Sequence, residues 1–331
     1  MSFSPFRRRL VLGTGLTILL LLPAMASFAG DPYLITLFSR ILIYALAAVS
    51  LDLIIGYGGM VSLGHAAFVG IGAYVVGILS FHVQDGTLLA SWPFELQASD
   101  AALIVWPAGV LISALMAALI GSVSLRTSGL QFIMITLAFA QMLFYLAVSL
   151  EAYGGDDGIS IWSRNRLPLV DLSDDSSFYY VCLVCLLVFL HLSHRLVFSR
   201  FGRVVRGAKQ NELRMQSLGF PTYRYKLVCF SIAGAGGGLA GVLIANQNEF
   251  VSPGLLHWTH SGELIVMVLL GGMGTLFGPV FGAAALLLME ELLSAYTEHW
   301  MVFLGPFLIL VVLFAKRGIY GWLSGAGGNH A

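Results

Sequence analysis

The chain has 331 residues, of which 58% are hydrophobic and only 10% are charged. Soluble domains carry about 25% charged residues, so this composition excludes a water-soluble globular protein. Basic and acidic residues number 17 each, and the zero net charge offers no electrostatic basis for binding nucleic acid. The apolar runs are long and do not alternate, which predicts an all-α, polytopic helical membrane protein.

About ten apolar segments follow one another, several of them shorter than the roughly 20 residues of a straight crossing. The first, 10–29, follows Arg7–Arg9 and resembles a secretory signal peptide. Because more spans follow, we interpret it as an uncleaved N-terminal helix that precedes a core at 34–315. The core segments are 34–55, 57–81, 102–124, 129–150, 178–198, 225–245, 263–272, 279–295 and 301–315.

The basic residues predict an orientation, because short loops rich in Lys and Arg stay in the cytoplasm. If the N-terminus is inside, ten crossings place the turn at Arg126, the basic loop 199–224 and a short tail at 316–331 on the cytoplasmic side. Most acidic residues then fall in outer loops, which agrees with this orientation. The count requires that 263–295 is a helix–break–helix hairpin and puts both termini in the cytoplasm.

Two glycine-rich breaks interrupt the apolar pattern, at 56–65 and at 271–279, and both contain G-G-M-x-[S/T]-L. Broken helices at membrane depth need protein or a water-filled cavity to satisfy their backbone groups, and paired breaks point to a transport path. The alternative is two ordinary turns at the cytoplasmic surface. The candidate path residues are Gly58, Gly59, Ser62, His65, Gly271, Gly272 and Thr275.

Three ionisable positions lie in or beside apolar runs and are functional candidates for that reason. For His65 the alternative is a hydrogen bond to backbone at a helix start. Asp52 could couple protons, or it could lie near the inner surface or bond to a neighbouring helix. Glu290 and its neighbour Glu291 are predicted at the outer rim, in contact with water.

Other motifs favour structural roles. Gly236–Gly241 matches G-x-G-x-x-G but lies in an apolar span, so we expect Gly237 and Gly241 to allow close helix packing. The Cys182/Cys185, His191/His194 and His257/His260 pairs lack further ligands, which argues against a metal site. No phosphate-binding loop and no nucleophile–base set is present, so we predict no catalytic residue and no cofactor in this chain.

The loop 199–224 has a helical pattern from Val204 to Leu218, with Ala208, Asn211 and Met215 on the same face and Gly219 at the end. This predicts one short amphipathic helix along the cytoplasmic surface. It would either anchor to lipid headgroups or act as a lever seated on a partner protein.

Seven stretches between about residues 40 and 320 resemble the LivM-type permease subunits of branched-chain amino-acid ABC importers. They are 56–74, 135–139, 154–158, 202–212, 218–219, 225–227 and 271–282. The chain departs from the family at Met60, where glutamine is frequent, and at Asp52, where asparagine is common. Residues 206–208 and Glu212 only approximate the glutamate-alanine-alanine loop of other ABC importers.

The resemblance implies that the chain, 1–331, is a single permease domain of the bacterial inner membrane that works by alternating access. It implies as partners a second, LivH-type permease, two cytoplasmic ATPases that carry ATP and Mg, and a periplasmic binding protein. The residues implied in ATPase coupling are Arg203, Arg206, Ala208, Asn211, Glu212, Leu218 and Gly219. Substrates would be branched-chain or related amino acids, with urea or short amides as alternatives. A proton-coupled secondary transporter and a channel or structural membrane protein are the rival classes.

Overall fold

The computed structural model describes residues 5–90, 96–97, 99–168, 170–296, 299, 302, 305–306 and 318–323. It confirms a polytopic helical membrane protein. In this part of the chain, 7 helical segments are long and apolar enough to cross a membrane, beginning at Tyr33, His65, Ala102, Leu130, Asp175, Thr222 and Gly278. They coincide with seven of the predicted segments, so these helices follow directly from apolar runs of spanning length.

The helices are α1 (Pro5–Ala29), α2 (Tyr33–Asp52), α3 (His65–Asp85), α4 (Ala102–Ser124), α5 (Leu130–Ser149), α6 (Asp175–Phe198), α7 (Arg200–Gln210), α8 (Glu212–Ser217), α9 (Thr222–Asn248), α10 (Trp258–Gly271), α11 (Gly278–Tyr296) and α13 (Gly318–Leu323). A π-helical turn, η1 (Leu53–Tyr57), extends α2, and two 3-10 turns are η2 (Glu151–Tyr153) and η3 (Pro253–Leu256). The strands are β1 (Leu88–Ala90), β2 (Leu96–Gln97), β3 (Ile159–Ser160) and β4 (Phe250–Val251).

Three predicted segments do not reach spanning length in the described residues. The apolar part of α1 covers only Gly13–Ala26, and α10 has 14 residues. The segment at 301–315 lies outside the described residues except for three positions, and so does most of the tail at 316–331. The number of crossings therefore stays a prediction.

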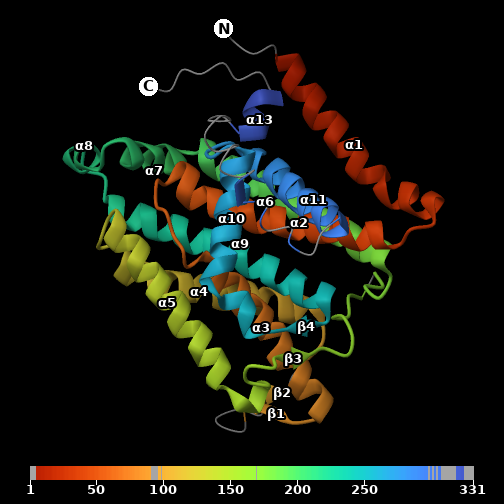
Figure 1. Cartoon of the computed structure of the whole chain (residues 1–331). Helices are drawn as coiled ribbons and strands as arrows, with labels where there is room; N and C mark the ends of the chain where they lie inside the picture. Colours follow the sequence, from red (N-terminus) through yellow and green to blue (C-terminus); the bar gives the residue numbers. More distant parts are fainter. Residues whose placement is uncertain are drawn as a thin grey trace.

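Helix α9 forms the centre of the bundle and packs against α2, α3 and α4 (Figure 1). Its glycines allow this packing. A Cβ on Gly241 would lie 1.8 Å from the Val69 carbonyl oxygen, and one on Gly72 would lie 2.1 Å from the Gly238 oxygen. The prediction that Gly237 and Gly241 belong to a close helix contact is confirmed, since Gly237 faces the His65 ring.

The loops gather at two opposite ends of the bundle, with α7 and α8 at one end and the four strands at the other (Figure 1). At the strand end, β3 and β4 pair antiparallel, Ile159 with Val251. Asn165 and Asn246 also join there, because the Asn246 amide donates to Asn165 Oδ1 at 2.9 Å. The basic helices and the strands thus lie at opposite ends, and the predicted orientation of these ends stays a prediction.

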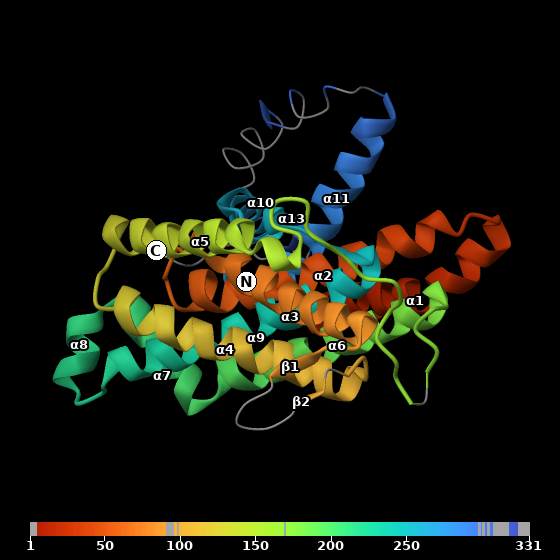
Figure 2. The same cartoon turned by 90° about the horizontal axis from the view of Figure 1, so that it is seen from below.

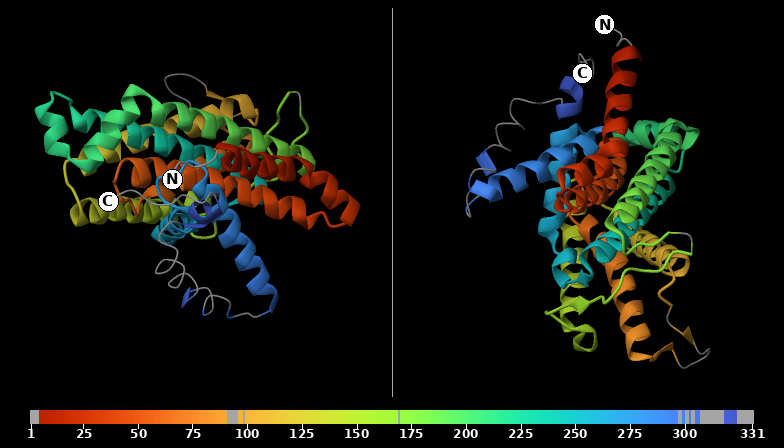
Figure 3. Two further views of the ribbon diagram at one scale, coloured as in Figure 1. Left: turned by 90° about the horizontal axis from the view of Figure 1, so that it is seen from above. Right: turned by 90° about the vertical axis from the view of Figure 1, so that its right-hand side faces the viewer.

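The hairpin predicted at 263–295 is present, since α10 and α11 are separated by an irregular segment at 272–277. Helix α11 lies against α2 and α10 and projects from the side of the bundle (Figures 2 and 3). It runs antiparallel to α2, because Gly274 bonds to Asp52 near one end and Glu291 bonds to Tyr33 at the other.

The single helix predicted from Val204 to Leu218 is wrong. The chain forms two helices, α7 and α8, because Asn211 adopts an extended backbone (φ −157°) and its side chain caps α8 by accepting from the Arg214 N–H. Of the residues predicted to share one face, Val204 and Ala208 are buried, whereas Leu218 is 65% exposed. Gly219 ends α8 with φ +86°, as its position predicted.

Candidate functional site

The first break, at 56–65, begins with a tight turn at the end of α2. The π-helical turn η1 ends when the N–H of Met60 bonds back to the Ile54 carbonyl at 2.9 Å. The chain then runs irregularly from Gly58 to Gly64 before α3 begins at His65. Gly59 takes φ +70°, a conformation that glycine adopts without strain.

The second break is held by its own hydroxyl group. Thr275 Oγ1 donates to the Gly272 carbonyl oxygen at 2.6 Å, and Gly272 and Gly274 take φ of +116° and +76°. A Cβ on Gly271 would lie 1.9 Å from the Gly278 oxygen. The turn is therefore closed so tightly that its glycines cannot be exchanged without moving α10 or α11.

The two breaks meet, although 222 residues separate Asp52 from Gly274. The Gly274 N–H donates to Asp52 Oδ1 at 2.8 Å, and Asp52 is only 2% exposed. A Cβ on Gly56 would lie 2.5 Å from the Gly274 nitrogen. The bond to a neighbouring element, one of the roles predicted for Asp52, is therefore present in the structure.

Helix α7 joins this junction through a residue that the sequence did not single out. Lys209 Nζ donates to the Gly56 carbonyl oxygen at 2.6 Å, and its stem lies beside Gly59. A cation at the carboxyl end of a helix satisfies a free carbonyl and interacts favourably with the helix dipole. The only signal in the sequence was that Lys209 is the single lysine among the arginines of the basic loop 199–224.

A cavity of about 320 Å³ opens beside this junction. It brings together two predicted path residues, Gly58 and Gly59, and two predicted coupling residues, Ala208 and Glu212. Lys209 lines it as well. Its other lining residues are Met60, Val61, Leu125, Thr127, Ser128, Gly129, Phe132, Ile133 and Lys226.

Ser62 and His65 lie apart from this cavity and are fully buried. Ser50 Oγ donates to the Ala47 carbonyl, so the 2.8 Å contact between His65 Nε2 and Ser50 Oγ requires that the imidazole donates. The contact of His65 is with the Ser50 side chain and not with backbone as the alternative expected, and a role of His65 in the path stays a prediction. The predicted residues Gly271, Gly272 and Thr275 shape the second break and do not line the cavity.

The coupling candidates divide into two groups. Glu212 is tied to its own chain, accepting from Lys226 Nζ at 2.6 Å and from Thr222 Oγ1 at 3.1 Å. Asn211 and Gly219 shape the ends of α8, and Arg206 lies over the Phe198 ring at 5.7 Å.

The second group faces outward. Arg203 is exposed, and Leu218 is joined by Leu213, which is 76% exposed and was not predicted. The sequence signal for Leu213 was its apolar side chain between the polar residues Glu212 and Arg214.

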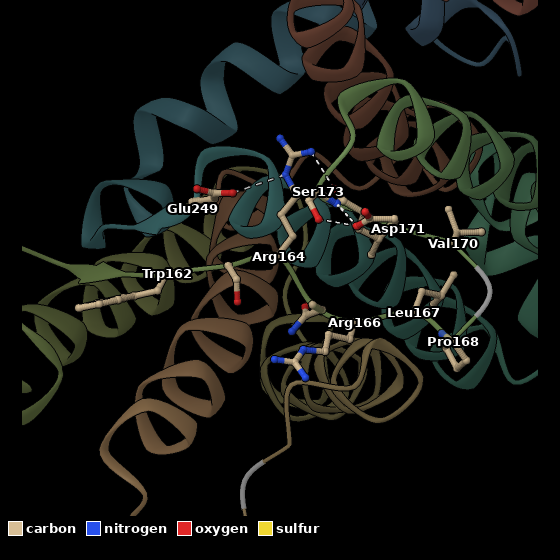
Figure 4. A pocket seen from close by; sticks show the side chains of 12 residues that line it. Trp162, Arg164, Arg166, Leu167, Pro168, Val170, Asp171, Ser173 and Glu249 are labelled. Atoms are coloured by element: carbon tan, nitrogen blue, oxygen red, sulfur yellow. Dashed lines mark hydrogen bonds and ion pairs between the residues drawn. The ribbon is translucent and has the colours of Figure 1, made fainter.

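The strand end carries a second hollow, of about 700 Å³ (Figure 4). Arg164 lies at its centre, pairing with Asp175 at 2.6 Å and with Glu249 at 3.7 Å. Asp171 lines the hollow too, and hydrogen bonds from Ser173 lower the pKa of its exposed carboxyl. Within the described part of the chain, no three His, Cys, Asp or Glu side chains are grouped to hold a metal ion.

Comparison with known proteins agrees with this architecture. Residues 33–313 match the family model described as "Branched-chain amino acid transport system / permease component". The LivM permease protein of the high-affinity branched-chain amino acid transport system of Salmonella typhimurium is 28% identical over 302 residues, which cover 84% of this chain and 68% of the relative. A probable LivM protein of Methanocaldococcus jannaschii is 26% identical over 80% of this chain and 83% of its own length.

A second type of permease is similar over a shorter stretch. The LivH permease protein of Escherichia coli is 33% identical over 144 residues, 43% of this chain and 46% of that protein. No solved structure matches. The predicted resemblance to LivM-type permeases is thus confirmed, and the chain belongs to the family of permease components of branched-chain amino acid transport systems.

Proposed function

We propose that the chain is the transmembrane permease subunit of an ATP-binding-cassette importer for branched-chain or related amino acids in a bacterial inner membrane. One observation carries the proposal. Lys209 of α7 bonds to Gly56, at the point where the two interrupted helices meet through Asp52 and Gly274. A displacement of α7 would therefore act directly on both breaks.

The mechanism that we propose is alternating access. Two cytoplasmic ATPases, which carry ATP and Mg, would seat α7 and α8 and move them when their nucleotide sites close. Lys209 would transmit that movement to Gly56, and the junction would shift α10 and α11 relative to α2. The predicted orientation, with both termini in the cytoplasm, would put α7 and α8 on the ATPase side.

The remaining partners follow from the relatives. A LivH-type permease is similar in sequence to this chain over 144 residues, and we propose that such a chain completes the path. A periplasmic binding protein would deliver the substrate at the strand end, where the hollow around Arg164 lies. The permease domain would comprise the whole chain, in contact with lipid at its apolar flanks.

Uptake by the reconstituted transporter tests the proposal. We expect proteoliposomes that contain this chain with its partner permease and ATPases to take up radiolabelled leucine only when ATP and the binding protein are both present. A protonophore should not lower the rate. Uptake that needs a proton gradient and ignores ATP would identify a secondary transporter instead, and passive flux would identify a channel.

The outward-facing leucines of α8 give a prediction for the ATPase contact. Leu213→Asp with Leu218→Asp is expected to lower the amount of ATPase that co-purifies about tenfold or more, because neighbouring exposed apolar side chains mark interaction sites and a carboxylate there would have to be desolvated. Gln210→Asp, at an exposed position on α7, is the control and should retain the ATPases. Full retention in the double variant would favour the interpretation of α7 and α8 as a lipid anchor.

A further inference from the structure

Four charged or titratable side chains from three helices lie together away from the junction. Arg40 of α2 lies 3.7 Å from Glu290 of α11, and His260 Nδ1 lies 2.9 Å from Glu263 Oε2 within α10. Electrostatic interactions link the two pairs, since Glu290 interacts with Arg40, Glu263 and His260. We call Arg40, His260, Glu263 and Glu290 the α2–α10–α11 charge cluster.

Two members of the cluster, Arg40 and Glu290, lie on candidate membrane spans. Helix α2 with its π-helical turn spans Tyr33–Tyr57, 25 residues or about 37 Å, against a hydrocarbon layer of about 30 Å. Arg40 is about 10 Å along α2 from Tyr33, hence about 6 Å inside a layer centred on this span. Its guanidinium stays beside the Tyr44 ring, at 5.8 Å. Glu290 lies in a second spanning helix.

These side chains are only partly covered. The side chains of Arg40 and Glu290 are 44% and 29% exposed, and those of His260 and Glu263 are 33% and 52% exposed. Ionisable groups at this depth are expensive when they face hydrocarbon, and they normally face a bundle interior or a water-filled path. This face of α2, α10 and α11 therefore borders a polar space in the assembled transporter.

An apolar crevice adjoins the charges. It has a volume of about 10 Å³, barely the room for one water molecule. His260 belongs to both the crevice and the charge cluster, and Tyr44 lines the crevice while its ring lies under Arg40. The other lining residues are Ala47, Ala66, Val69, Ile244, Leu255 and Leu264. The crevice is too small for an amino-acid side chain, and a movement of α10 relative to α2 would have to widen it.

We propose that the charge cluster and this crevice form the substrate site for a zwitterionic amino acid with an aliphatic side chain. Arg40 would bind the carboxylate, Glu290 and Glu263 would bind the ammonium group, and the crevice would take the side chain. Charges of both signs on one face match a zwitterion, and the crevice lining is aliphatic apart from Tyr44 and His260. Urea and short amides carry no such pair of charges, so the site selects against them.

The site rests on the proposed function and connects to its mechanism. The three helices that carry the cluster are the ones that meet at the two breaks. Glu290 is about 18 Å along α11 from Gly278, where the second break ends. A shift of the junction at Asp52 and Gly274 would therefore change the separation of Arg40 and Glu290 and so open or close the site.

Substrate binding to the assembled transporter tests the site. Arg40→Gln and Glu290→Gln are each expected to weaken equilibrium binding of radiolabelled leucine to the purified complex about tenfold or more, because each removes a charge-assisted hydrogen bond. Leucinamide, which lacks the carboxylate, should compete weakly in the wild type and equally weakly in Arg40→Gln. Glu291→Gln is the comparison variant, since Glu291 accepts from the Tyr33 hydroxyl and acts on the cluster only through its charge beside Glu290.

Reversal of the Arg40–Glu290 ion pair distinguishes a role in leucine binding from a role in holding the helices together. Arg40→Glu with Glu290→Arg keeps a pair of opposite charges, so it should assemble but still bind leucine weakly. If the double variant binds leucine as the wild type does, Arg40 and Glu290 form a structural ion pair or a contact between permeases. That result would overturn the proposal that they bind the substrate. Wild-type binding in both single variants would overturn it as well. If a variant at Arg40 does not assemble, His260→Gln probes the same site from α10. Absence of leucine binding and uptake in the wild type would instead refute the proposed function.

Discussion

Replacing Gly56 with alanine is expected to abolish uptake while the chain still inserts in the membrane. The added Cβ would lie 2.1 Å from Asp52 Oδ1 and 2.5 Å from the Gly274 nitrogen, so it would push apart the two breaks and their hydrogen bond. The Gly274 nitrogen is a backbone atom and cannot rotate away, and Asp52 could turn its carboxylate aside only by breaking its bond to Gly274. Overpacking of this kind destabilises a protein by about 1–3 kcal/mol. Here the strain falls on the junction of the two breaks, which we propose to move during transport. Leucine uptake and the melting temperature of the purified complex would measure the two effects.

Gly262→Ala is the matched control for this substitution. Gly262 lies in α10, next to residues of the charge cluster, and a Cβ there would meet nothing within 4 Å. Alanine is also the better helix former, so uptake and melting temperature should stay at or slightly above wild type. Wild-type uptake by Gly56→Ala would contradict a rigid junction and would leave the breaks as ordinary surface turns.

The sequence predicted the class of fold because hydrophobicity and length determine whether a helix crosses a membrane. It also predicted the breaks at 56–65 and 271–279, since glycine runs weaken a helix whatever surrounds it. What it did not predict is contact between the breaks. The bond from Gly274 to Asp52 depends on how α10 and α11 lie against α2, and no local pattern encodes that arrangement.

The same limit explains the residues that were missed. Lys209 looked like any other cation of the basic loop, because its partner is a backbone carbonyl 153 residues away. Glu290 and its neighbour Glu291 were predicted to be solvated at the outer rim, and the sequence did not predict that Glu290 pairs with Arg40 of α2. Conversely, Glu212 was implied in coupling by resemblance, but its carboxylate is engaged by Lys226. A role for Glu212 in coupling would therefore act through the position of α8.

Replacing Lys209 with methionine is expected to uncouple ATP hydrolysis from transport. Methionine keeps much of the stem beside Gly59 and removes the charge that bonds to Gly56. A hydrogen bond to a charged group contributes about 1.5–3 kcal/mol, so leucine transported per ATP hydrolysed should fall roughly tenfold to a hundredfold. The ATPases should remain bound, since Leu213 and Leu218 are unchanged. Co-reconstituted ATPase and uptake assays give the ratio.

Two companion variants distinguish a coupling contact from a general effect of charge. Lys209→Arg retains a donor that can reach the Gly56 carbonyl, and it should recover much of the ratio. Gln210→Met changes the next, exposed position of α7 and should leave the ratio at the wild-type value. If Lys209→Met transports leucine with wild-type stoichiometry, the bond between α7 and the first break is not the coupling contact. Movement of α7 and α8 would then have to reach the breaks through apolar packing, such as that of Val205 and Ala208.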